Sequence, residues 1–131
     1  MPSLQTSRGL DAARRVLSTL AWAGIVALIV ITVVPADERP TTSLTHSLEH
    51  LSAFAIVGTL VGLAFRMRPL SLFMLAVAFS GSLELIQIPL PTRHARFEDF
   101  IYDSLGAWIG LAIGYCILAL VPRRQRLIWR G

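Results

Sequence analysis

Two histidines and a glutamate stand at the start of an apolar run, at a spacing that suits metal chemistry. Residues 46–50, HSLEH, fit the pattern H-x-x-E-H of one class of zinc hydrolases. On a helix, His46 and His50 lie one turn apart, so both imidazoles can reach the same ion. Glu84 or Asp103 would then supply a third ligand, with Glu49 as general base. Three fixed positions arise easily by chance. We therefore keep the zinc site (His46, His50, Glu84) as an alternative and expect no cofactor.

A second set of polar residues follows further along the chain. Glu84 and Gln87 are one turn apart and share a helix face. The guanidinium fork of Arg93 suits a phosphate or a carboxylate. A buried Glu84 close to His50 would be a candidate proton carrier. The candidate catalytic residues are therefore His50 and Glu84, and the candidate substrate-binding residues on this basis are Gln87, Arg93 and Asp103.

The composition indicates a membrane protein. Apolar residues make up 54% of the 131-residue chain and charged residues only 15%, against about 25% in soluble domains. All 12 basic residues are Arg, in short clusters between apolar runs, which is typical of a membrane protein and not of a nucleic-acid binder. A span needs about 20 mostly apolar residues. The sequence predicts an all-α protein with four transmembrane helices, over residues 16–36, 44–65, 70–90 and 104–122.

The first apolar run also has a rival interpretation as a signal peptide. Its length exceeds the roughly 7–15 residues of a signal-peptide core, and three more apolar runs follow. We therefore expect the first run to be a retained helix.

The Arg residues predict that both termini are cytoplasmic. The N-terminal arm (residues 1–15), the turn between the second and third spans, and the tail (123–131) hold 9 Arg and 1 acidic residue. The other two connections, with Asp103 beside them, hold 3 Arg and 5 acidic residues. Because Arg-rich loops stay on the cytoplasmic side, we expect the arm and the tail on the inner face of a cell inner membrane.

With this topology, the ionisable residues within the spans lie in the outer half of the membrane. At 1.5 Å per residue, His50 and Glu84 each lie roughly 9 Å below the outer end of their spans. A charge near the bilayer centre costs about 2.5–3.5 kcal/mol, so such residues need partners or a function. A fixed ion pair of Glu84 with Arg93, or a hydrogen bond to His50, is one explanation.

Glycines at every fourth position favour close packing of the second and fourth helices. They are Gly58 and Gly62 in the second span, and Gly106, Gly110 and Gly114 in the fourth. Such small-residue stripes face neighbouring helices, and His50 and Asp103 share their faces. We expect a buried polar cluster below the outer surface, capped by the loop of residues 91–99 with Arg93.

The ordered set of motifs resembles the VanZ-like family. The matching pieces are residues 49–54 (EHLSAF), Glu84 with Gln87, Arg93 with Asp99, and Gly106 with Gly110. The resemblance covers about residues 44–115. It implies a small membrane protein with a four-helix core, from a family named after a member linked to low-level teicoplanin resistance. It places the family's His on His50, its Glu and Gln on Glu84 and Gln87, its Arg on Arg93 and its Asp on Asp99. It thereby adds Asp99 to the candidate substrate-binding residues. The chain departs from the family pattern in having His46-Ser47 instead of Asp-Lys, and Asp103 where Asn is usual.

Three functions fit these residues, and the sequence leaves open whether the protein is an enzyme. The first is binding of, or action on, an envelope lipid or lipid-linked glycan, with an effect on glycopeptide susceptibility. The second is a non-catalytic accessory subunit that contacts a membrane-protein partner through the glycine faces. The third is zinc-dependent hydrolysis at residues 46–50. Transport is disfavoured, because transport sites lie near the midplane and the inner half of the predicted spans has no ionisable residue.

Overall fold

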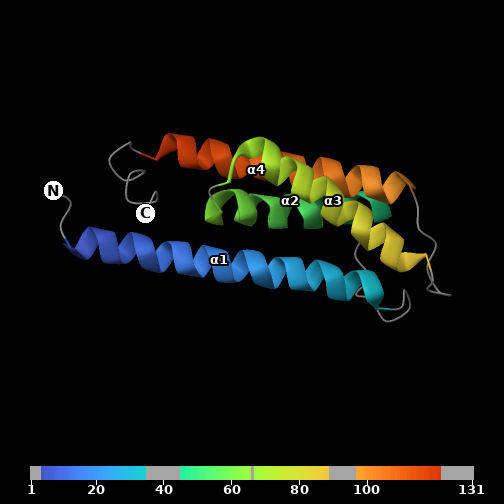
Figure 1. The fold of residues 1–131 in the computed structure, drawn as a ribbon, viewed down its shortest axis with the longest axis horizontal. Coiled ribbons are helices and arrows are strands. Elements are labelled where there is room, and N and C mark those ends of the chain that lie inside the picture. The colour runs from blue at the N-terminus through green and yellow to red at the C-terminus, as the bar shows by residue number, and fades with distance from the viewer. Residues whose placement is uncertain (1–3, 35–44, 66, 89–96, 122–131) are drawn as a thin grey trace.

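The protein is a bundle of four helices in a computed structural model, which describes residues 4–34, 45–65, 67–88 and 97–121. The helices are α1 (Leu4–Val33), α2 (His46–Ala64), α3 (Pro69–Gln87) and α4 (Phe97–Leu120). Each runs antiparallel to the next along the chain, so that α2 and α4 run in the same direction (Figure 1). All four are long and apolar enough to cross a membrane. The predicted all-α class with four spans is confirmed.

The helix boundaries follow from local chemistry. Pro69 occupies the first turn of α3, where its missing N–H removes no helical hydrogen bond. Glu49 lies in the first turn of α2, and Glu98 and Asp99 lie in the first turn of α4. Acidic side chains there are stabilised by the positive end of the helix dipole. In the structure, α4 begins at Phe97, well before the predicted span start at Ser104. Asp99 therefore belongs to this helix and not to a loop.

Burial is inverted relative to a water-soluble protein. Asp103 is only 2% exposed and Glu84 only 9%, whereas Leu70 is 72% exposed and Leu85 67%. Exposed leucines of this kind on the flanks of a bundle suit contact with lipid chains, and buried acids avoid those chains. The distribution is that of a membrane protein whose polar groups lie inside the bundle.

Helices α2 and α4 make the most extensive contact in the bundle, and glycines bring their backbones together. A Cβ added at Gly106 would overlap the carbonyl oxygen of Leu51, and one at Gly110 would overlap that of Ala55. A Cβ at Gly58 would lie 2.5 Å from the carbonyl oxygen of Ala107. The predicted glycine faces therefore pack on each other. A membrane-protein partner, which stays a prediction, would have to contact other faces.

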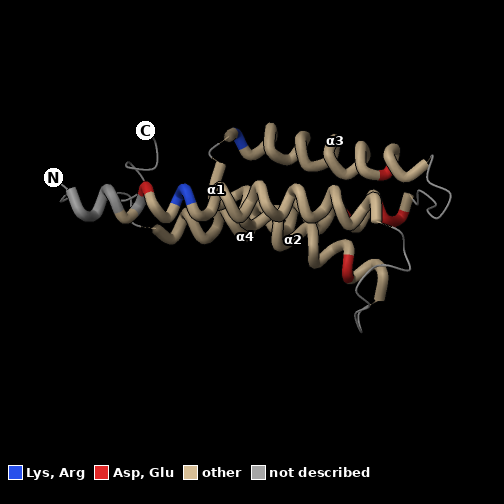
Figure 2. Tube along the Cα trace, turned by 90° about the horizontal axis from the view of Figure 1, so that it is seen from below, with Lys and Arg blue, Asp and Glu red and all other residues tan. Residues whose placement is uncertain are grey.

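Apart from Asp11, which lies near Arg14 on α1, the described Arg and acidic residues lie at opposite ends of the bundle (Figure 2). Arg14 and Arg15 lie near the start of α1, and Arg68 precedes α3 at the same end. At the other end, where α2 and α4 begin and α3 finishes, the described acidic residues are Glu49, Glu84, Glu98, Asp99 and Asp103. This polarity matches the charge asymmetry on which the predicted topology rests.

Candidate functional site

The packing of α2 on α4 sets the register of the site. The pairs Leu51–Gly106 and Ala55–Gly110 advance by four residues on both helices, as expected for parallel neighbours. Toward the starts of the two helices, almost the same register places His50 opposite Asp103 and His46 opposite Asp99. These are the two His–Asp pairs that the structure contains within its described residues. The close glycine contact therefore positions the polar pairs.

The inner pair is His50 with Asp103. Nδ1 of His50 lies 2.8 Å from Oδ1 of Asp103, with side-chain exposures of 15% and 3%. A carboxylate can only accept a hydrogen bond, so Nδ1–H is the donor. When the ring is neutral, Nε2 of His50 is the remaining acceptor. The pair fixes both the orientation and the tautomer of this imidazole.

The outer pair is His46 with Asp99. Nε2 of His46 donates to Oδ2 of Asp99 over 3.2 Å, and the imidazole is 44% exposed whereas the aspartate is 8% exposed. The rings of His46 and His50 meet edge to face, with centroids 4.5 Å apart. One ligand atom from each of His46, His50 and Asp99 lies within 4.8 Å of the other two. The described residues thus contain a His–His–Asp group that could hold a metal ion.

Helix α3 contributes a polar stripe to the same end of the bundle. Ser80, Glu84 and Gln87 lie on one face of the helix and are all buried. The charges of Glu84, Asp99 and Asp103 all act on the His50 ring. The hydroxyl groups of Ser80 and Ser104 are buried with no hydrogen-bond partner among the described residues. The site therefore combines carboxylates, an amide and hydroxyl groups.

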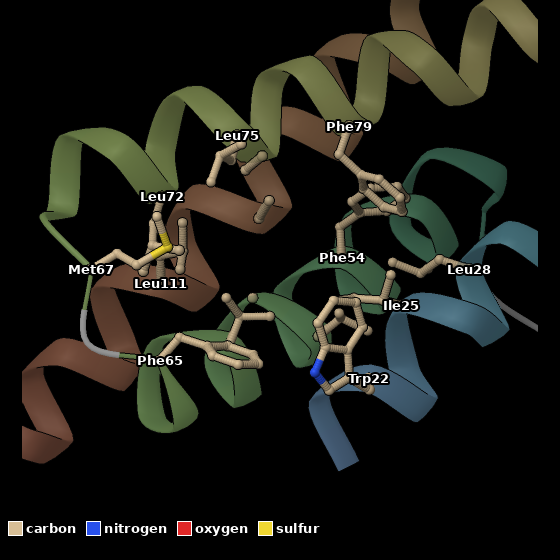
Figure 3. A pocket seen from close by; sticks show the side chains of 15 residues that line it. Trp22, Ile25, Leu28, Phe54, Phe65, Met67, Leu72, Leu75, Phe79 and Leu111 are labelled. Carbon is tan, nitrogen blue, oxygen red and sulfur yellow. The ribbon is translucent and has the colours of Figure 1, made fainter. Parts of the chain in front are cut away.

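An apolar cavity of about 350 Å³ lies deeper in the bundle, lined by all four helices (Figure 3). Trp22, Ile25 and Leu28 of α1 form one wall, and Phe54 of α2 together with Phe65, which directly follows α2, forms part of another. Helix α1 packs mainly on α2 and touches α3 only lightly. The cavity therefore occupies the space between α1 and α3, which diverge.

Two aromatic rings separate the cavity from the polar cluster. Phe54 lies one turn below His50, about 6 Å along α2. Phe79 lies five residues before Glu84 on α3. The two rings contact each other with centroids 6.3 Å apart, and both line the cavity. A ligand with a polar head and an apolar tail would have the polar cluster above these rings and the cavity below them.

The predicted site residues have distinct outcomes. His50, Glu84, Gln87 and Asp103 are partly or fully buried, at the expected end of the bundle. Asp99 joins them as part of α4. Arg93 and the rest of the capping loop before α4 lie outside the described residues. For the metal alternative, the described residue that groups with both histidines is Asp99, and not Glu84 or Asp103.

Sequence reasoning missed the pairing of His46 with Asp99, and a usable signal was present. The charge-free run alone predicts that the fourth helix starts at residue 104. Residues 97–103, FEDFIYD, combine apolar residues with two acids at a helix start, which is a common N-terminal signature. The buried serines and the apolar cavity had no comparable signal in the sequence.

Comparison with known proteins agrees with the motifs. A model of the VanZ/LLP1 family matches residues 14–119, a range that contains most of α1 and nearly all of α2, α3 and α4. No curated protein sequence and no solved structure is significantly similar to the chain. The family match covers more than half of the sequence and includes every described residue of the polar cluster. The chain therefore belongs to the VanZ/LLP1 family.

Proposed function

We propose that this protein binds an envelope lipid or a lipid-linked glycan from within the membrane. The observation that supports this proposal best is the sequence of environments along the bundle. A buried polar cluster at one end gives way, within about one helical turn of His50, to an apolar cavity. Lipids have the same succession of a polar headgroup and an apolar chain.

The polar cluster suits a headgroup rich in hydroxyl or amine groups. The carboxylates of Glu84 and Asp99 can accept hydrogen bonds from such groups, and the amide of Gln87 can donate as well as accept. The buried hydroxyls of Ser80 and Ser104 offer further donors without partners among the described residues. Buried polar groups are normally hydrogen-bonded, so unsatisfied ones favour a site that completes them with a ligand. Arg93 is proposed as the ligand of a phosphate in the same headgroup.

The cavity suits part of an apolar chain. Its volume of about 350 Å³ is within the lower range of small-molecule pockets, roughly 300–1,000 Å³. The lining is aliphatic and aromatic, with no charged side chain. The contact between α1 and α3 is light, and the proposal takes this side of the bundle as the entry of the chain from the bilayer.

Native mass spectrometry of protein purified in mild detergent tests the proposal. We expect the wild-type protein to retain a lipid, and Glu84→Gln to weaken its binding by roughly 10- to 100-fold, because a hydrogen bond to a charged group contributes about 1.5–3 kcal/mol. Ala76→Leu should also lower retention, because Ala76 lines the cavity and the larger side chain would occupy it. Strains carrying Glu84→Gln should change in glycopeptide susceptibility.

The matched control is Glu98→Gln, which makes the same substitution at the same end of the bundle. Glu98 is exposed in the first turn of α4, so its loss should leave lipid retention unchanged. Wild-type protein with no retained lipid would contradict the proposal. Retention in Glu84→Gln and Ala76→Leu equal to that of the wild type would contradict it too.

The proposal places the polar cluster at the outer face of a cell inner membrane, with both termini cytoplasmic. A C-terminal fusion to a fluorescent protein that matures only in the cytoplasm should therefore fluoresce. A fusion to alkaline phosphatase, which is active only outside the cytoplasm, should be inactive at the same position. The opposite pair of results would reverse the orientation and move the cluster to the cytoplasmic side.

A further inference from the structure

We propose that His46, His50 and Asp99 bind one divalent transition-metal ion of the Zn²⁺ class. This inference goes beyond lipid binding and does not depend on it. The chemical basis is the donor set, because two imidazoles and a carboxylate are ordinary ligands of zinc and of neighbouring first-row metals. The structural basis is that α2 and α4 bring these three groups together at the end of the bundle where both helices begin.

The distances fit a four-coordinate ion. Bonds of about 2.0–2.1 Å in tetrahedral geometry place neighbouring ligand atoms roughly 3.3 Å apart. Nε2 of His46 and Oδ2 of Asp99 are 3.2 Å apart, and all three ligand atoms lie within 4.8 Å of one another. The remaining gap can close through the imidazole of His46, which is 44% exposed and has room to turn. The ion would replace the proton that His46 and Asp99 share.

Asp103 supplies the hydrogen-bonding carboxylate that metal-bound histidines usually contact through their second ring nitrogen. Its carboxylate accepts the hydrogen bond from Nδ1–H of His50 at 2.8 Å, and Nε2 would be the nitrogen of that ring that binds the ion. Histidine ligands commonly donate their second N–H to a carboxylate, and this partner orients the ring and raises its basicity. The half-exposed position of His46 leaves a fourth coordination position open toward the end of the bundle.

The buried acids beside the two imidazoles favour a cation at the His–His–Asp group. Asp99 and Asp103 each contact one of the imidazoles, and Glu84 is buried at the same end of the bundle. Carboxylates removed from water are normally paired or bound to a metal. A divalent cation at the His–His–Asp group would offset this accumulation of negative charge.

Metal analysis of the full chain tests the proposal. The protein should carry no histidine tag, and Cys116→Ser should be present throughout, because the exposed thiol of Cys116 is an independent metal ligand. After chelator treatment and lipid removal, equilibrium dialysis against Zn²⁺ should give one ion per chain. His46→Gln and Asp99→Asn should each weaken Zn²⁺ binding at least tenfold. Asp103→Asn should weaken it about 10–100-fold, as other second-sphere changes do.

Asp11→Asn is the matched control for Asp99→Asn, because Asp11 lies near the Arg-rich end of the bundle. Its zinc affinity should equal that of the parent. Substituting Co²⁺ should give the intense visible absorption of a four-coordinate ion, which a misfolded protein would not show. Full binding in His46→Gln, or less than one ion per parent chain at micromolar free Zn²⁺, would overturn the proposal. His94 is the third histidine of the sequence, and loss of binding only in His94→Ala would place the ion elsewhere and overturn the proposal as well.

Discussion

Gly110→Ala should destabilise the bundle by about 1–3 kcal/mol or more, which is the usual effect of overpacking a close contact. An added Cβ would overlap the carbonyl oxygen of Ala55 and lie 2.7 Å from the backbone nitrogen of Thr59. These are backbone atoms, so no side-chain rotation can relieve the overlap, and α2 must move away from α4. Helices in a bilayer associate mainly through close packing and interhelical hydrogen bonds, so separation removes much of what holds this pair. Unfolding in mixed micelles by titration with a denaturing detergent measures the change.

Gly81→Ala is the control, because it makes the same substitution within another helix. A Cβ at Gly81 would lie 3.6 Å from Cε2 of Phe100, an ordinary contact. Alanine has the higher helix propensity, by about 0.8–1.0 kcal/mol, so this variant should be as stable as the wild type or more stable. If Gly110→Ala unfolds at the same detergent concentration as Gly81→Ala, the close contact of α2 with α4 is wrong.

His50→Ala should cost roughly 3–5 kcal/mol of unfolding free energy, measured with a chelator present so that no metal contributes. The imidazole is the described hydrogen-bond partner of Asp103, at 2.8 Å, and this carboxylate is only 3% exposed. Its removal leaves a buried negative charge without that partner. The cost comes mainly from the stranded carboxylate and not from the lost ring contacts.

A double-mutant cycle separates these two contributions. His50→Ala combined with Asp103→Ala should be more stable than His50→Ala alone, because the stranded charge is gone. Leu48→Ala is the control for side-chain truncation on the same turn of α2, since Leu48 is 49% exposed. It should change stability by less than about 1 kcal/mol. A double variant less stable than His50→Ala would show that the pair is not coupled in this way.

The sequence was sufficient for the architecture because the membrane restricts the choices. Uninterrupted apolar runs of span length leave helices as the only structure that satisfies their backbone groups. Glycines at every fourth position then predicted which faces of α2 and α4 meet, and the backbone contacts at Gly106 and Gly110 confirm this interface. Once that interface was fixed, His50 and Asp103 had to lie inside the bundle.

The sequence alone could not predict which residues of the polar cluster pair with each other. Whether His50 meets Glu84 or Asp103 depends on helix register to within one turn, and periodicity does not set the register between helices. The structure pairs His50 with Asp103 and His46 with Asp99. The cavity depends on how far α1 and α3 diverge, which follows from side-chain volumes across four helices and not from any local motif.

The parallel contact between α2 and α4 has a consequence for biosynthesis. These helices are not consecutive, and His46 and Asp99 stand 53 residues apart in the chain. At about 5–20 residues per second, a ribosome needs about 3–10 s to make that interval. During this delay, the glycine face and both imidazoles of α2 lack their final neighbours on α4. They lie either in the insertion machinery or beside α1 and α3. Assembly of the bundle is therefore completed only by the last helix to be made.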